Sequence, residues 1–112
     1  MLFFKKKNAA DKTKEDSDLI KQNDKRIEAL IVLARENREL INRLREVQEK
    51  IRYLTPRADA KVMEFDQKIK EQIEDLKIRM VKDEDAEKAL QAAERAILQI
   101  GVLISDRNAL II

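Results

Sequence analysis

Apolar residues recur at alternating spacings of three and four along the stretch from residue 30 to residue 54. The positions of this seam are Leu30, Leu33, Asn37, Leu40, Leu44, Val47, Ile51 and Leu54. The spacing is that of the a and d positions of a heptad repeat, with Asn37 as the single polar member. Ile27, Ala34 and Ile41 lie on one flank and widen the apolar stripe beyond what a two-stranded coiled coil buries. The stripe therefore predicts a helix that packs against two partner helices.

We expect this helix to cover about residues 18–54. The residues that could cap its first turn are Thr13, Ser17, Asp18 and Asn23. Its end is set by Thr55 and Pro56, because a residue before proline is pushed out of the helical conformation and proline lacks an amide donor. Proline is favoured as the first residue of a helix, so Thr55 is expected to cap the next one.

Two further helices are predicted, over about residues 57–81 and 84–108. The break between them has neither Gly nor Pro, but the apolar stripe changes phase across residues 82–85, and Asp83 is a good capping residue. The alternative is one unbroken helix over residues 57–108, which could not fold back on itself and would have to dimerise. We favour the turn because of the change of phase.

The last predicted helix changes character along its length. Its first half is lined with alanine, and its second half has larger apolar residues. Gly101 lies inside this helix, where glycine costs about 1 kcal/mol relative to alanine. We therefore expect a neighbouring helix to approach Gly101 closely.

Together these elements predict an all-α fold, an antiparallel up-down-up three-helix bundle with coiled-coil-like packing. The first helix would be longer than the other two by about ten residues, so its N-terminal part, about residues 18–28, should overhang the bundle. Leu19, Ile20 and Ile27 in this overhang would lack intramolecular cover. These three residues are the candidate surface for self-association.

Asn37 is the candidate register-setting residue, because a buried asparagine on a coiled-coil seam fixes the alignment of its partners. It could pair with a polar residue such as Gln72, or with its own copy in a dimer. The alternative is that Asn37 lies at the edge of the stripe and contacts water. The sequence leaves both interpretations open.

Charged residues make up 41% of the chain, and the formal net charge is +2. Residues 1–14 contain five lysines and one aspartate, so they hold a net charge of +4 and the remaining residues hold −2. The basic excess therefore lies in a predicted flexible tail, residues 1–16, and not on the predicted bundle, residues 17–112. Nucleic-acid-binding proteins usually concentrate basic residues on the folded body.

The start of the tail combines apolar and basic residues, namely Leu2, Phe3, Phe4, Lys5, Lys6 and Lys7. These six residues are candidate contacts for an anionic membrane surface, with the apolar side chains inserted and the ammonium groups on the lipid headgroups. Such binding would be weak, because three apolar side chains bury little area. The alternative is a frayed terminus whose lysines keep it in solution.

The composition also bears on location. The chain has no Cys, which excludes disulfides and removes any argument for secretion. No run approaches the roughly 18 apolar residues that a membrane-spanning helix needs. We therefore expect a cytoplasmic protein, at the periphery of the membrane if the tail binds lipid.

The residues that most enzymes use are missing. The chain contains neither His nor Cys, which removes the usual general base, the commonest metal ligand and the thiolate nucleophile. A single Gly excludes a glycine-rich phosphate loop. A general acid needs a carboxyl group whose pKa is raised by burial, and no acidic residue falls in a predicted core position. We expect no enzymatic activity, no cofactor, no bound metal and no small-molecule substrate.

A line of arginines could contact nucleic acid. Arg38, Arg45 and Arg52 are seven residues apart, so they lie along one side of the first predicted helix. Acidic residues at helix-pair spacings are interleaved with them, and no series of aromatic residues is placed for base stacking. These features favour a solvated salt-bridge face over nucleic-acid binding.

The expected function is that of a non-enzymatic helical module for structure or protein interaction, which binds a protein partner or itself as a homo-oligomer. The alternative is a peripheral membrane adaptor, in which the same bundle uses residues 1–7 as a weak anchor. Helical bundles serve many unrelated roles, so the predicted fold alone selects neither.

Overall fold

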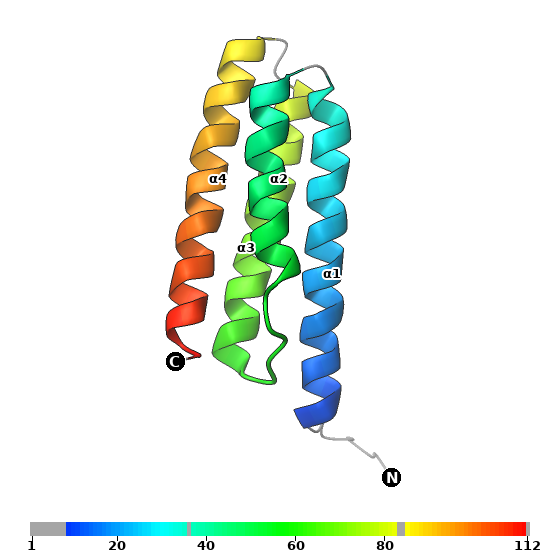
Figure 1. Ribbon diagram of the computed structural model, residues 1–112, viewed down its shortest axis with the longest axis vertical. Coiled ribbons are helices and arrows are strands. Elements are labelled where there is room, and N and C mark those ends of the chain that lie inside the picture. The colour runs from blue at the N-terminus through cyan, green and yellow to red at the C-terminus, as the bar shows by residue number, and fades with distance from the viewer. Residues whose placement is uncertain (1–8, 36, 83–84, 112) are drawn as a thin grey trace.

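The computed structural model describes residues 9–35, 37–82 and 85–111, which form four helices (Figure 1). The helices are α1 (Ala9–Ala34), α2 (Arg38–Arg52), α3 (Ala60–Lys82) and α4 (Ala86–Ala109). No strand occurs in these three ranges. The prediction of an all-α fold is confirmed, and the predicted number of three helices is corrected to four.

The additional helix arises because the predicted helix over residues 18–54 is two helices. The chain reverses direction between Ala34 and Arg38, so α1 and α2 form a helical hairpin. Arg35 has a left-handed backbone conformation with a φ of 49°, and its amide donates to the carbonyl of Val32 at 3.3 Å. The apolar spacing continues across this turn, so the heptad pattern cannot distinguish one long helix from a hairpin.

Asn37 begins the second helix of the hairpin. Its side-chain oxygen accepts a hydrogen bond from the amide of Leu40 at 3.2 Å, which is the geometry of an N-cap. Asparagine is one of the best residues for this position, and its place in the apolar seam concealed that role. The structure thus gives Asn37 a capping function where the sequence suggested a register-setting one.

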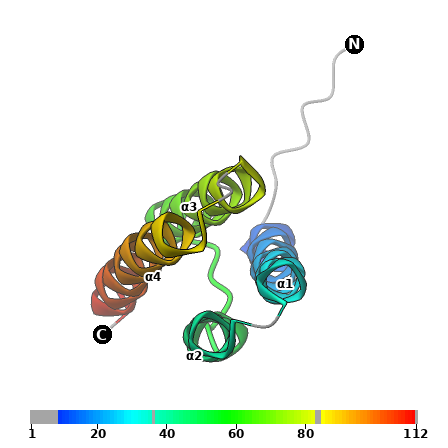
Figure 2. The same ribbon diagram turned by 90° about the horizontal axis from the view of Figure 1, so that it is seen from above.

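The four helices alternate in direction but are not arranged in chain order. α1 packs against α2 and α3, and α4 also packs against α2 and α3, so the order around the bundle is α1, α2, α4, α3. The consecutive helices α2 and α3 therefore occupy opposite corners, and the segment of residues 53–59 crosses between them (Figure 2). We call the end of the bundle that contains this crossing the lower end, as it is drawn in Figure 1.

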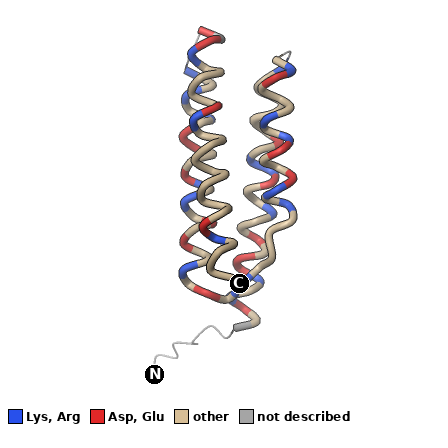
Figure 3. The backbone as a smooth tube through the Cα atoms, turned by 60° about the vertical axis from the view of Figure 1, so that its left-hand side comes forward, with Lys and Arg blue, Asp and Glu red and all other residues tan. Residues whose placement is uncertain are grey.

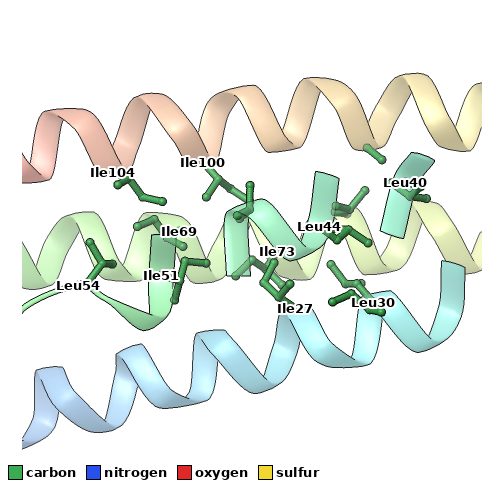
Figure 4. Packing of buried hydrophobic residues seen from close by; sticks show 14 of the residues in the cluster. Ile27, Leu30, Leu40, Leu44, Ile51, Leu54, Ile69, Ile73, Ile100 and Ile104 are labelled. Atoms are coloured by element: carbon green, nitrogen blue, oxygen red, sulfur yellow. The ribbon is translucent and has the colours of Figure 1, made fainter. Parts of the chain in front are cut away.

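All four helices contribute to one continuous apolar cluster, which we call the main core (Figure 4). The large side chains with almost no exposed surface are Ile27, Leu30, Leu44, Ile51, Ile69, Ile73, Leu76 and Ile100. Most of the predicted seam lies in this core, but Leu33 is 40% exposed. Burial of these branched side chains is the main favourable contribution to folding.

The predicted overhang of the first helix is wrong. Since α1 ends at Ala34, it packs along its neighbours and does not extend past them by several turns. Leu19, Ile20 and Ile27 are all buried within the chain. The intramolecular cover that was expected to be missing is present, so these residues no longer provide a surface for self-association.

Two smaller expectations differ from the structure at helix ends. α3 is capped by Asp59, whose carboxylate accepts from the amide of Lys61 at 2.8 Å, and not by Thr55. α4 is capped by Asp85, and the expected cap, Asp83, lies outside the described residues. Aspartate can fill any of several nearby cap positions, so the sequence predicts the break better than the capping residue.

The predicted boundary between the N-terminal tail and the first helix also differs from the structure. α1 begins at Ala9, inside the stretch predicted as a tail of residues 1–16. The candidate membrane contacts Leu2, Phe3, Phe4, Lys5, Lys6 and Lys7 lie outside the described residues. Among the described helices, none is both long enough and apolar enough to cross a membrane.

Candidate functional site

The lower end of the bundle contains a fully buried group of charged side chains, Asp16 on α1, Asp66 on α3 and Arg107 on α4, which we call the ion cluster. The Arg107 Nε donates to Asp66 Oδ1 at 2.8 Å. The Arg107 Nη2 donates to Asp66 Oδ2 and to Asp16 Oδ2, both at 3.2 Å. The two carboxyl groups therefore meet at one guanidinium nitrogen, and Arg107 joins three helices.

The segment that crosses the bundle is attached to the same cluster. The Arg107 Nη2 also donates to the carbonyl of Thr55 at 2.8 Å, and the amide of Arg57 donates to Asp16 Oδ2 at 2.8 Å. These contacts hold the chain on both sides of Pro56. The cluster thus positions the crossing between α2 and α3 as well as the three helices.

Not every atom of the cluster is satisfied. Asp16 Oδ1 and Arg107 Nη1 are buried and have no hydrogen-bond partner among the described residues. A buried polar atom without a partner costs free energy, so the cluster is a poorer source of stability than its short contacts suggest.

The charges in the cluster do not balance when both carboxyl groups are ionised, because one cation faces two anions. Burial first, and then the hydrogen bond and charge of the neighbouring Asp16, raise the pKa of Asp66 to about 7. Hydrogen bonds and attraction from Arg107 oppose this shift but do not cancel it. Near neutral pH a proton therefore resides on Asp66 for much of the time.

The expectation that no acidic residue occupies a core position is thus wrong. Asp66 lies between Val62 and Ile69 on the core-facing stripe of α3, and Arg107 follows Ile104 on that of α4. The sequence signal was present as two acids and one base at core spacing. It could be recognised only after the helix directions had placed all three residues at the same end.

The ion cluster is not accessible to a substrate from solution, because its three side chains have no exposed surface. In the described part of the chain, no group of three or more His, Cys, Asp or Glu side chains is arranged to hold a metal ion. The geometry is that of an internal connection between helices. It suits a structural or switching role.

Charged residues on the outside are interspersed along all four helices (Figure 3). On the predicted arginine line, Arg52 forms two hydrogen bonds with Asp24, at 3.0 and 3.2 Å, and these bonds lower the pKa of Asp24. Arg43 contacts Glu39 on its own helix and Glu94 on α4. Arg43 is not a member of the predicted line, so Arg52 is the member of that line for which the structure describes an ion pair.

The outward side of α4 presents exposed apolar residues flanked by charged ones. Leu98 is 70% exposed and Val102 is 54% exposed. Arg95 and Asp106 lie on either side of them and are also exposed, and neither side chain pairs with another described residue. We call these four residues the α4 outer face.

Three residues of the α4 outer face, Arg95, Leu98 and Val102, belong to a second heptad-like stripe on α4. Its members alternate at spacings of four and three and are Gln91, Arg95, Leu98, Val102, Ser105 and Ala109, all of them exposed. A stripe with this spacing is what one helix needs to pack along another. The sequence pattern was used to predict only the core-facing stripe of α4, so this outward-facing stripe was missed.

A second apolar surface lies near the end of α3, where Ile78 and Val81 border a hollow of about 490 Å³. Glu74 at the edge of this hollow already contacts Arg26 of α1 at 3.8 Å. The charge of Glu74 is therefore partly compensated by an ion pair within the chain. The α4 outer face is the stronger candidate for an intermolecular contact.

No protein-family model matches the chain, and neither a curated protein nor a solved structure matches it. Four packed helices host many unrelated functions and by themselves assign none. Function must therefore be inferred from the residues and their geometry.

Proposed function

We propose that this protein is a non-enzymatic helical interaction module that self-associates through the α4 outer face. The supporting observation is the exposure of Leu98 and Val102 between two unpaired charges of opposite sign. In the proposed dimer, the α4 helices of two copies pack antiparallel across a two-fold axis. Such an interface is isologous, so one surface must be complementary to itself.

The positions along α4 meet this requirement. When the two helices cross at Ile100, Leu98 of each copy lies opposite Val102 of the other. Four apolar side chains are then covered, and each contributes up to about 1.5–3 kcal/mol when fully buried. Because Ile100 itself faces the main core, the crossing does not disturb the fold.

The flanking charges also match in this arrangement. Arg95 of each copy lies opposite Ser105 and beside Asp106 of the other copy. Two symmetric ion pairs result, each worth about 0.2–1 kcal/mol at an exposed site. A parallel arrangement would place like charges together and is disfavoured.

We expect weak association, because one helix face buries less area than a standard interface and binding costs translational and rotational freedom. A dissociation constant on the order of 100 µM corresponds to about −5.5 kcal/mol. Sedimentation equilibrium of the full chain from about 10 µM to about 1 mM covers this range.

The test compares Leu98→Glu with Val32→Glu, a matched control at an exposed valine on α1. Leu98→Glu should leave the chain monomeric throughout, and Val32→Glu should dimerise as the unmodified chain does. Circular dichroism of both variants verifies that they fold. An unmodified chain that is monomeric at every concentration would overturn the proposal, as would a Leu98→Glu variant that dimerises normally.

A charge exchange tests the antiparallel register. Arg95→Glu should weaken the dimer by about tenfold, because two attractive pairs become repulsive. The double variant Arg95→Glu/Asp106→Arg should restore the original affinity. Failure of the double variant to recover would contradict this register, even if the α4 outer face were the interface.

A further inference from the structure

The ion cluster contains one more carboxyl group than a static ion pair between helices needs. It encloses one guanidinium and two carboxyl groups, all without exposed surface. With both carboxylates ionised, a net negative charge is buried, which is strongly unfavourable. Binding one proton neutralises the site and allows one carboxyl group to donate a hydrogen bond to the other.

We infer that the ion cluster is a proton-controlled latch, in which one proton on Asp66, beside Asp16 and Arg107, holds the lower end of the bundle closed and its loss loosens that end. The parts held by the latch are the first turns of α1, the crossing segment of residues 53–59 and the last turn of α4. Each of them is bound to the cluster by a hydrogen bond or contains one of its members.

The charges around Asp66 support this inference. The charged groups that act on it are Arg107 from α4, which favours its ionised form, and Asp16 from α1, which disfavours it. The crossing segment presents only the Thr55 carbonyl and the Arg57 amide to the cluster. The other described charged side chains on the surrounding elements are at least partly exposed, among them Lys12, Glu15, Arg52, Arg57, Lys70 and Asp106.

The inference also depends on the position of the latch at the edge of the main core. Ile20, Ile69 and Ile104 border it on the side of the main core, whereas Leu19 and Val62, which are buried close to Asp16 and Asp66 in the sequence, are not part of the main core. Opening this end therefore exposes less apolar surface than global unfolding does. Local opening is therefore expected to be the process of lowest free energy that exposes the buried charge to water.

The direction of the pH dependence follows from the raised pKa of Asp66, about 7 in the closed form. In the opened form the carboxyl group is solvated, with a pKa of about 3.9. The closed form therefore binds the extra proton between about pH 4 and pH 7. Its advantage is complete below pH 4, is lost as the pH rises to 7, and is absent above pH 7.

Amide hydrogen exchange of the full chain measures this opening residue by residue. After correction for intrinsic exchange rates, protection of amides in residues 10–20 should fall on the order of 50-fold between pH 5 and pH 7 and then level off. Amides of main-core residues such as Leu44 and Ile73 should change much less. A lower end whose protection is constant from pH 5 to pH 8 would overturn the latch.

Two substitutions identify the proton. Asp66→Asn mimics the protonated form with nearly the same shape, so protection at the lower end should become independent of pH. Asp16→Asn leaves one balanced ion pair and should have the same effect, which provides a second test if Asp66→Asn does not fold. Asp24→Asn is the control, because it removes a partly exposed partner of Arg52 outside the ion cluster and should keep the pH dependence of the unmodified chain. Retention of that dependence in Asp66→Asn or Asp16→Asn would refute the inference.

Discussion

The main core joins all four helices and the ion cluster joins three of them, α1, α3 and α4, at the lower end, and the two regions do so in different ways. The main core consists of branched apolar side chains from all four helices, whose attraction has no preferred direction. The ion cluster consists of three side chains whose atoms must meet at hydrogen-bond distances. The main core tolerates small changes of shape, whereas the ion cluster requires particular atoms and a particular number of protons.

The comparison teaches that burial alone does not measure stabilisation. A buried ion pair contributes little relative to apolar residues of the same volume, yet removal of one partner is costly because it leaves an unpaired charge inside. Leu44 and Arg107 are both fully buried. They are expected to respond to substitution by similar amounts, but for opposite reasons and with different pH dependence.

The largest effect is expected for Arg107→Met, which leaves Asp16 and Asp66 buried without a cation. The free energy of unfolding at pH 7 should fall by about 3–5 kcal/mol. At pH 5 the Asp66 carboxyl group, whose pKa is raised by burial, holds a proton, so the loss should be smaller, about 1–3 kcal/mol. Urea unfolding at the two pH values measures the difference.

The control for this variant is Arg45→Met, at an exposed arginine on α2. It should change the free energy of unfolding by no more than about 0.5 kcal/mol at either pH. An Arg107→Met variant that is equally destabilised at pH 5 and pH 7 would show that lost packing, and not uncompensated charge, dominates.

The next effect concerns the main core. Ile73→Ala removes buried methyl and methylene groups at a side chain that is 1% exposed. The free energy of unfolding should fall by about 3 kcal/mol, within the range of about 2–5 kcal/mol for such truncations. Because no titratable group is involved, the difference from the unmodified chain should be the same at pH 5 and pH 7 in urea unfolding.

The same substitution at an exposed isoleucine of the same helix is the matched control. Ile78→Ala should cost no more than about 0.5 kcal/mol, since Ile78 is 52% exposed. A pH-dependent loss in Ile73→Ala would mean that the two regions are coupled, and the distinction between them would have to be abandoned.

The two regions also differ in how far the sequence predicts them. Periodic apolar residues such as Leu44 and Ile73 identify their own helices and core faces, because the hydrophobic effect depends on position and not on a specific partner. Asp66 gives no such signal. Its partners are distant in the chain, and only the bundle arrangement brings Asp16 and Arg107 to it.

The hairpin turn was missed for a related reason. Asn37 interrupts the seam at a heptad position, and a heptad pattern is compatible both with a continuous helix and with two helices that share a core. The hydrogen bond by which Asn37 caps α2 at Leu40 depends on the local backbone conformation, which is left-handed at Arg35. No glycine or proline in the sequence indicates a turn at this point.

The smallest effect is expected in α4, the helix that contributes Ile100 to the main core and Arg107 to the ion cluster. The sequence predicts a close neighbour at Gly101, but a Cβ atom added there would meet no atom within 4 Å. Gly101→Ala should therefore raise the free energy of unfolding by about 0.5–1 kcal/mol through helix propensity and lower chain entropy, equally at pH 5 and pH 7. Gly101→Ser adds the same Cβ atom but favours the helix less than alanine by about half a kcal/mol, so it should stabilise less in urea unfolding. If alanine and serine were both destabilising, an unseen steric constraint at Gly101 would be indicated, and the space beside α4 would be smaller than the structure shows.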